Sequence, residues 1–156
     1  MTVPMSSWPA IHVFVYGTLR RGEQRDINLL MPTPHWMGRA SVAGVLYDLG
    51  DYPGLRLCTS PTAQQRVEGE VYEISHELER LLDEIEEVSA QPAAEYVRRH
   101  VVVQLLRQAQ TQGDATTTGL NCLVYEVAHD RIVRCPVIAD GDWVSYRQQR
   151  HGRTDL

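Results

Sequence analysis

The fold is decided by Val13-Phe14-Val15-Tyr16-Gly17-Thr18-Leu19-Arg20-Arg21-Gly22, an apolar run that stops at a Gly-Thr step and then turns polar and basic. Residues 11–16 are rich in β-branched and aromatic side chains, which predicts a strand. A glycine at the strand exit permits backbone angles that other residues avoid and lets a ligand approach the main chain. Because main-chain N–H groups freed there can converge on a carboxylate or phosphate, we expect a small anionic ligand at this turn. A strand that simply ends is the alternative interpretation.

The segments around this turn are mostly strands. Glycines at 38 and 44 interrupt a β-prone stretch over 36–49, as bulges and bends do at the corners of small barrels. Further strands are predicted at 55–58, 67–74, 96–106, 119–127 and 132–135, with a hairpin loop over 108–118. Helices are predicted at 23–31, at 75–87 and from 141 onward.

The order of these segments predicts an α+β fold. Strands outnumber helices, and hairpin-like connections predominate over crossover units. We therefore expect a small, mostly antiparallel β-barrel with one or two flanking helices. Residues 1–156 are expected to form a single domain, in which a leader over 1–10 and a tail over 150–156 are loosely ordered.

Composition limits the possible partners. The 156 residues are 43% hydrophobic and carry a formal net charge of -5, which is enough apolar material for one core and does not favour nucleic acid or an anionic membrane as a partner. No apolar run approaches the roughly 20 residues that span a bilayer. The first ten residues lack the basic and apolar regions of a secretory signal. We therefore expect a cytoplasmic location, while the oligomeric state stays open.

Several kinds of chemistry are excluded by residue type. All 15 basic residues are arginine, so a Schiff-base lysine, a pyridoxal-phosphate lysine and a P-loop lysine are absent. The three cysteines include no CxxC pair, and the six histidines form no HxH or HxxxH pair. Neither a disulfide framework nor a metal site is predicted.

One glutamate of the predicted helix is a candidate acid–base group. Leu78, Leu82 and their apolar neighbours form a stripe at helical spacing, and Glu86 lies on the flank of that stripe, one turn beyond Leu82. A carboxylate drawn against the core at the C-terminal end of a helix has a raised pKa, as a general base requires. Glu79 lies at a similar angular distance, and an acidic run is otherwise typical of a solvated face, so helix geometry alone leaves both alternatives open.

Five motifs follow one another along the chain: Val15-Tyr16-Gly17-Thr18-Leu19-Arg20-Arg21-Gly22; Gly44-Val45-Leu46-Tyr47-Asp48-Leu49-Gly50 with Tyr52-Pro53-Gly54; Val67-Glu68-Gly69-Glu70-Val71-Tyr72; Leu82-Asp83-Glu84-Ile85-Glu86 with Tyr96-Val97-Arg98; and Gly141-Asp142-Trp143. In this order and spacing, the chain resembles the γ-glutamylcyclotransferase-like superfamily, which includes the avirulence-induced-gene proteins and the γ-glutamylamine cyclotransferases. The resemblance covers residues 13–146.

The resemblance implies a barrel with a cavity, no cofactor and a small-molecule γ-glutamyl substrate. In the family, the Tyr-Gly-Thr-Leu turn binds the glutamyl head group through main-chain N–H groups, a role that falls on Tyr16, Gly17, Thr18 and Leu19. The family's catalytic acid corresponds to Glu86.

The resemblance also extends to residues around the expected pocket. Tyr96 and Arg98 match the family's next strand, so we expect them to contact substrate. Tyr125 is included as a tyrosine whose hydroxyl faces the substrate, although such aromatic residues more often pack in a barrel. Asp83 is expected to be a structural neighbour of the base, and Glu87 stands where many relatives have glycine.

The implied reaction is an intramolecular aminolysis. The α-amine of the substrate attacks its own γ-carbonyl, which closes 5-oxoproline and releases an amine, while Glu86 takes the proton from the α-ammonium and passes it to the leaving nitrogen. The alternative is a non-catalytic small-molecule-binding or interaction module on the same fold. The two hypotheses differ in whether Glu86 faces the cavity beside the amides of residues 17–19.

Overall fold

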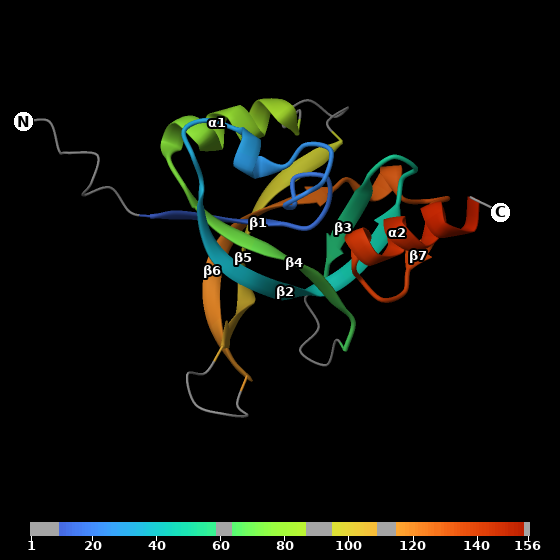
Figure 1. Ribbon diagram of the computed structural model, residues 1–156. Coiled ribbons are helices and arrows are strands. Elements are labelled where there is room, and N and C mark those ends of the chain that lie inside the picture. The colour runs from blue at the N-terminus through green and yellow to red at the C-terminus, as the bar shows by residue number, and fades with distance from the viewer. Residues whose placement is uncertain (1–9, 59–63, 87–94, 109–114, 155–156) are drawn as a thin grey trace, which may run out of the picture.

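The computed structural model describes residues 10–58, 64–86, 95–108 and 115–154 (Figure 1). Its elements, in chain order, are β1 (Ile11–Val15), the 3-10 turn η2 (Ile27–Leu29), β2 (His35–Asp48), β3 (Pro53–Leu57), β4 (Arg66–Ile74), α1 (His76–Ile85), β5 (Tyr96–Gln108), β6 (Ala115–Val127), the 3-10 turn η3 (His129–Arg131), β7 (Val137–Ile138) and α2 (Trp143–Thr154).

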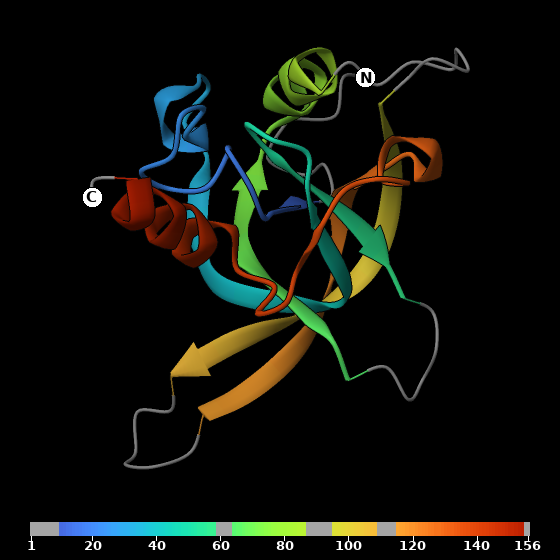
Figure 2. The ribbon, with the colours of Figure 1, turned by 90° about the vertical axis from the view of Figure 1, so that its right-hand side faces the viewer.

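Five strands close into a barrel, which confirms the predicted α+β class. The hydrogen-bonded order is β2-β4-β1-β6-β5, and β5 returns to β2 through the pairs Ala40–Leu105 and Ser41–Gln104. Only the β1–β6 pairing is parallel among the described strands. Strands β3 and β7 extend the sheet along the last residues of β2, outside the ring. Both helices and the segment after β1 gather around one end of the barrel, with that segment between them (Figure 2).

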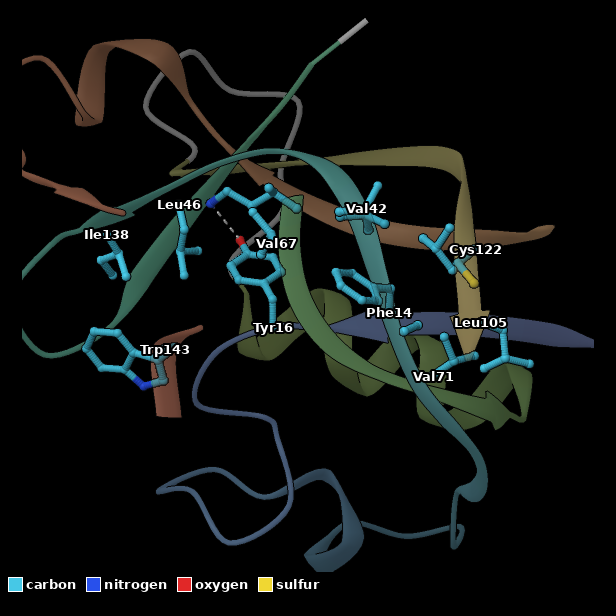
Figure 3. Packing of buried hydrophobic residues seen from close by; sticks show 14 residues of the cluster. Phe14, Tyr16, Val42, Leu46, Val67, Val71, Leu105, Cys122, Ile138 and Trp143 are labelled. Carbon is cyan, nitrogen blue, oxygen red and sulfur yellow. Dashed lines mark hydrogen bonds between the residues drawn. The ribbon is translucent and has the colours of Figure 1, made fainter. Parts of the chain in front are cut away.

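From Val13 to Val15, strand β1 is buried on both faces, which explains why its sequence is apolar there. Phe14 and Tyr16 belong to the core cluster inside the barrel, whereas Val13 and Val15 belong to the cluster beneath α1. Figure 3 shows the inner cluster, in which the Tyr16 hydroxyl accepts a hydrogen bond from the backbone N–H of Leu55 at 3.3 Å. The chain therefore leads directly from the core into the Gly-Thr turn.

Two of the strand predictions need correction. Strands β5 and β6 pair out to Gln108 and Ala115, so the loop is shorter than 108–118; the threonines there are β-branched and continue the ladder in a hairpin that projects beyond the barrel (Figure 1). The strand predicted at 132–135 is wrong. The N–H groups of Ile132 and Cys135 donate within successive turns, and the strand forms two residues later, as β7.

The helix predictions agree with the structure in position but not in extent. Within 23–31, only Ile27–Leu29 is helical. This turn begins after its N-cap Asp26, whose side chain accepts from the N–H of Asn28. Helix α1 begins after its N-cap Ser75, as predicted, and ends at Ile85. Helix α2 continues to Thr154, so most of the predicted tail has a helical backbone. Most of the predicted leader, residues 1–9, lies outside the described residues. Neither described helix is long and apolar enough to cross a membrane.

A buried arginine joins the turn, the barrel and α2. The guanidinium of Arg20 donates to Glu70 on β4 at 3.0 Å and to Asp142, the residue before α2, at 2.9 Å. Glu70 also accepts from the N–H of Arg21 at 2.9 Å, so its carboxylate is well satisfied although its side chain is only 7% exposed. The residues that follow β1 are therefore held against two other parts of the fold.

A second arginine holds α1 against β5. Arg98 on β5 donates to Glu79 at 2.8 Å and to Asp83, which lie one turn apart on the same side of the helix. The hydroxyl of Tyr125 on β6 donates to the other carboxylate oxygen of Asp83 at 2.7 Å. Together with the buried leucines of α1, these contacts fix the position of the C-terminal end of the helix within the fold.

Replacing Arg20 with methionine should destabilise the fold because Glu70 would remain buried without its cation. We expect a loss of about 3 kcal/mol in the free energy of unfolding, measured by urea denaturation. Arg39→Met, at an exposed position of β2, is the control and should cost far less. Equal losses in the two variants would contradict this account of Arg20.

Replacing Arg98 with alanine should loosen α1, at a smaller cost because the guanidinium is partly exposed. We expect a loss of about 1 kcal/mol in the free energy of unfolding. Hydrogen exchange should show faster opening of the amides of α1, while Arg80→Ala, an exposed arginine on the same helix, leaves those amides unchanged. Unchanged exchange in Arg98→Ala would mean that the leucines alone hold the helix.

Candidate active site

A cavity of about 890 Å³ opens at the end of the barrel where the two helices lie. Its walls come from the turn after β1, the loop between β2 and β3, the end of α1, the start of β5, one residue of β6 and the inner side of α2. The polar and aromatic residues among its lining are Phe14, Tyr16, Thr18, Glu23, Gln24, Arg25, Asp51, Tyr52, Glu86, Glu95, Tyr96, Tyr125, Trp143, Arg147 and Arg150.

The Gly17–Leu19 turn lines this cavity, and its main-chain groups differ in how they are paired. The carbonyls of Gly17, Thr18 and Leu19 accept from the N–H groups of residues 20, 25 and 27 at 3.0, 2.8 and 2.9 Å. The N–H groups of the same three residues have no protein acceptor within the described parts of the chain. Successive main-chain donors of this kind form a concave site suited to an anion.

Gly17 is required here by close packing. Its φ is not in the left-handed region, contrary to our reason for expecting glycine at this position. A Cβ at residue 17 would instead lie 2.7 Å from Cγ of Pro53, so the turn can sit against the β2–β3 loop only without a side chain. The neighbouring Tyr16 hydroxyl donates to the carbonyl of Tyr125 at 2.6 Å, which fixes the start of the turn.

Glu86 lies at the C-cap of α1, where its backbone N–H donates to the carbonyl of Leu82 at 2.9 Å. Its side chain lines the cavity together with Gly17, Thr18 and Leu19. Its carboxylate makes no hydrogen bond or ion pair with any described residue. Burial raises the pKa of Glu86 from its ordinary value of 4.5 to about 7, with Arg25 acting against this rise and Glu95 adding to it.

Glu95 and Arg25 are two charged residues of the cavity that the sequence analysis did not single out. Glu95 accepts a hydrogen bond from the hydroxyl of Tyr52 at 2.5 Å, which raises the pKa of Tyr52 to about 12. Arg25 lies two residues before η2 and lines the same cavity. A partial signal for Glu95 was present, since it directly precedes Tyr96 at the start of a predicted strand; nothing in the sequence indicated Arg25.

The structure brings together all but one of the expected site residues. Tyr96 and Tyr125 line the cavity with the turn and Glu86, whereas Arg98 does not. Arg98 is instead engaged by the carboxylates of α1 described above. The hydroxyl of Tyr96 donates to the carbonyl of Pro53 at 3.0 Å. Burial raises the pKa of both tyrosines, so their hydroxyls stay protonated and serve as donors.

No described group of three or more His, Cys, Asp or Glu side chains could hold a metal ion.

Helix α2 contributes Arg147, which forms a bidentate pair with Glu23 at 2.7 Å for each bond and so closes one side of the cavity. The question of how Glu87 is oriented lies outside the described residues.

Comparison with known proteins finds relatives of this chain. A γ-glutamylaminecyclotransferase of Bos taurus is 33% identical over 150 residues, covering 90% of this chain and 78% of that protein. A γ-L-glutamyl-butirosin B γ-glutamyl cyclotransferase of Niallia circulans is 43% identical over 77 residues, and the match spans 49% of this chain and less than half, 46%, of that protein.

Solved structures agree with the sequence matches. An AIG2-like protein of Mus musculus has 27% sequence identity and a TM-score of 0.61, over 83% of this chain and 86% of that chain. The family model described as γ-glutamyl cyclotransferase, AIG2-like, matches residues 13–145, which include the cavity turn and Glu86. The chain therefore belongs to the AIG2-like γ-glutamyl cyclotransferase family, and it resembles enzymes of this class.

Proposed function

We propose that this protein converts a γ-glutamyl amine, or a similar γ-glutamyl conjugate, to 5-oxoproline and a free amine, with Glu86 as general acid and base. The observation that carries the proposal is the position of Glu86, whose unpaired carboxylate lines the same cavity as the free amides of the Gly17–Leu19 turn. The names of the bovine and Niallia circulans relatives support this class of substrate.

The electrostatics of Glu86 suit proton transfer near neutral pH. A pKa of about 7 lets the carboxylate take a proton from an α-ammonium and give it up again within one turnover. A fully solvated glutamate, with a pKa near 4.5, would be a much weaker base and would hold its proton poorly. Burial without a partner is therefore the property of Glu86 that supports its catalytic role.

The amides of Gly17, Thr18 and Leu19 are assigned to the α-carboxylate of the substrate. This group carries a full negative charge, so it gains most from converging N–H donors. The alternative is that one of these amides polarises the γ-carbonyl and stabilises its oxygen in the transition state. In either arrangement the turn holds the flexible glutamyl chain folded, which brings its two ends together.

Each step of the proposed reaction uses only the substrate and Glu86. Glu86 removes a proton from the α-ammonium, and the neutral amine attacks the γ-carbonyl carbon to form the lactam C–N bond. The protonated Glu86 then delivers this proton to the departing nitrogen as the original C–N bond breaks. The attacking nitrogen loses a second proton as it becomes the lactam N–H, and this proton ends on the released amine. The products are therefore 5-oxoproline and an ammonium ion, and Glu86 returns to its ionised form.

A binding module on the same fold is the second hypothesis. It would not require an unpaired, buried carboxylate beside the anion-binding amides, and such a group lowers stability above its pKa. The orientation of Glu86 therefore favours the enzyme.

The direct test is an assay for 5-oxoproline with a panel of γ-glutamyl alkylamines, γ-glutamyl diamines and γ-glutamyl dipeptides. We expect product from at least one class. Failure of the whole panel to give product, with the protein folded, would favour the binding module.

Replacing Glu86 with glutamine should remove the acid–base group while preserving the shape of the cavity. We expect kcat/KM to fall roughly 10²–10⁴-fold. In the unaltered protein, kcat/KM should rise with pH up to about 7, where the carboxylate becomes ionised. Glu84→Gln removes an exposed acid two residues away and should retain activity. Activity that survives in Glu86→Gln would rule out this mechanism.

The same variant should also change the dependence of stability on pH. Because the pKa of Glu86 is higher in the folded protein than in the unfolded chain, folding favours the protonated form, and stability falls as pH rises from 4.5 to about 7. Glu86→Gln should therefore raise the Tm more at pH 8 than at pH 4.5. An equal change in Tm at both pH values would contradict the raised pKa.

A further inference from the structure

A second carboxylate faces the cavity that contains Glu86. Glu95 stands at the start of β5, and both glutamates line the same space. Within the described residues, neither carboxylate is paired with an arginine or histidine, unlike Glu23, Asp48 and the acids of the two arginine clusters. The fold thus places many of its partly buried acids in ion pairs, whereas Glu86 and Glu95 make none with the described residues, although Arg25 acts on Glu86 through its charge.

Glu95 is held in place through both its backbone and its side chain. Its carbonyl accepts from the N–H of Ala128 at 2.7 Å, which fixes its backbone to the end of β6. Its carboxylate accepts from the Tyr52 hydroxyl at 2.5 Å, and the carbonyl of Tyr52 accepts from the N–H of Leu49 at 3.0 Å. The link therefore joins two anchored segments of the wall.

Tyr52 remains a donor at every pH at which the protein would be assayed. Its pKa is raised to about 12, chiefly by the hydrogen bond to Glu95. A tyrosine adds no charge to the cavity, whereas an arginine in its place would cancel the charge of Glu95. The contact therefore fixes the position of the Glu95 carboxylate.

Glu86 is faced by charged and titratable groups from every wall. Arg25 is the cation whose charge lowers its pKa, while Glu95 raises it. The tyrosine hydroxyls remain neutral, and Arg147 is neutralised by Glu23. The remaining charged groups of the lining are Asp51, on the β2–β3 loop, and Arg150, which is paired with Asp48.

We propose that Glu95, fixed by Tyr52, is a positioning residue that keeps Glu86 able to carry a proton at neutral pH by holding a second negative charge in the same cavity. The proposal rests on the proposed function and deepens it. Arg25 opposes the rise in the pKa of Glu86 that burial causes, and the negative charge of Glu95 offsets the effect of Arg25. Glu95 thus acts through Glu86, without itself exchanging a proton with substrate.

The test measures the titration of Glu86 directly, by ¹³C NMR of its side-chain carboxyl in the free protein. Glu95→Gln should shift its midpoint to lower pH by roughly 0.5–1 unit, because a like charge is removed. The acidic limb of kcat/KM should move in the same direction. Glu95→Asp retains the charge and should restore most of the original midpoint.

Two further variants separate this role from a structural one. Tyr52→Phe leaves the charge of Glu95 but releases it, so the midpoint should shift by a smaller amount in the same direction. Glu84→Gln removes an equal charge outside the cavity lining and should leave the midpoint unchanged. An unshifted midpoint in Glu95→Gln, or a shift of equal size in Glu84→Gln, would overturn the proposal.

The NMR titration does not depend on turnover. If no γ-glutamyl compound yields 5-oxoproline but the midpoint shifts as expected, the proposed function fails and the coupling of the two glutamates stands. If 5-oxoproline forms but the midpoint does not shift, the function stands and the role of Glu95 is overturned.

Discussion

The geometry of the site depends on the buried guanidinium of Arg20. Three segments that are distant in sequence meet on this one side chain: the turn after β1, strand β4 through Glu70, and the start of α2 through Asp142. A buried charge is costly unless its hydrogen bonds are satisfied, so the cluster tolerates only a narrow range of positions for its members. The turn that carries the amides of Gly17–Leu19 is therefore held by a contact of a residue that does not line the cavity.

Glu86 is the opposite case, a carboxylate that the fold buries without a cation. The contrast with Glu70 is informative because both lie near the same turn, and only Glu70 is surrounded by donors. Departures of this kind, in which a group is left unsatisfied at some cost in stability, are expected at functional sites. Helix α1 makes the arrangement possible, because its leucines and the Arg98 contacts hold its last residue against the cavity.

The two arginines that follow the turn, Arg20 and Arg21, are engaged within the protein. The sequence predicted an anion at this turn because main-chain N–H groups are freed where the strand ends at a glycine. In the structure, Arg20 is paired inside the protein and Arg21 stacks over the ring of Trp36 at 4.4 Å. Arg98 was likewise expected at the substrate and instead anchors α1. The main-chain amides are what remains available for an anion, and Arg25 is the arginine of the cavity lining whose charge acts on Glu86.

The sequence by itself determined the strands and helices with strong local patterns. The apolar run from Val13 to Tyr16 and the capped, leucine-striped α1 could be predicted because their signals lie within a few residues. The motif resemblance also brought Glu86 and the turn together as one site. Short elements such as β7 could not be predicted, since their backbone hydrogen bonds depend on distant partners.

Only the tertiary structure decided which charges face the cavity. Arg20 and Glu70 are 50 residues apart and Arg20 and Asp142 are 122 apart, so no local pattern reveals that these groups neutralise one another. The same holds for Tyr52 and Glu95, which are 43 residues apart. Sequence specifies which residues are charged, but burial and pairing set the proton affinity of Glu86, and both arise only when the barrel closes.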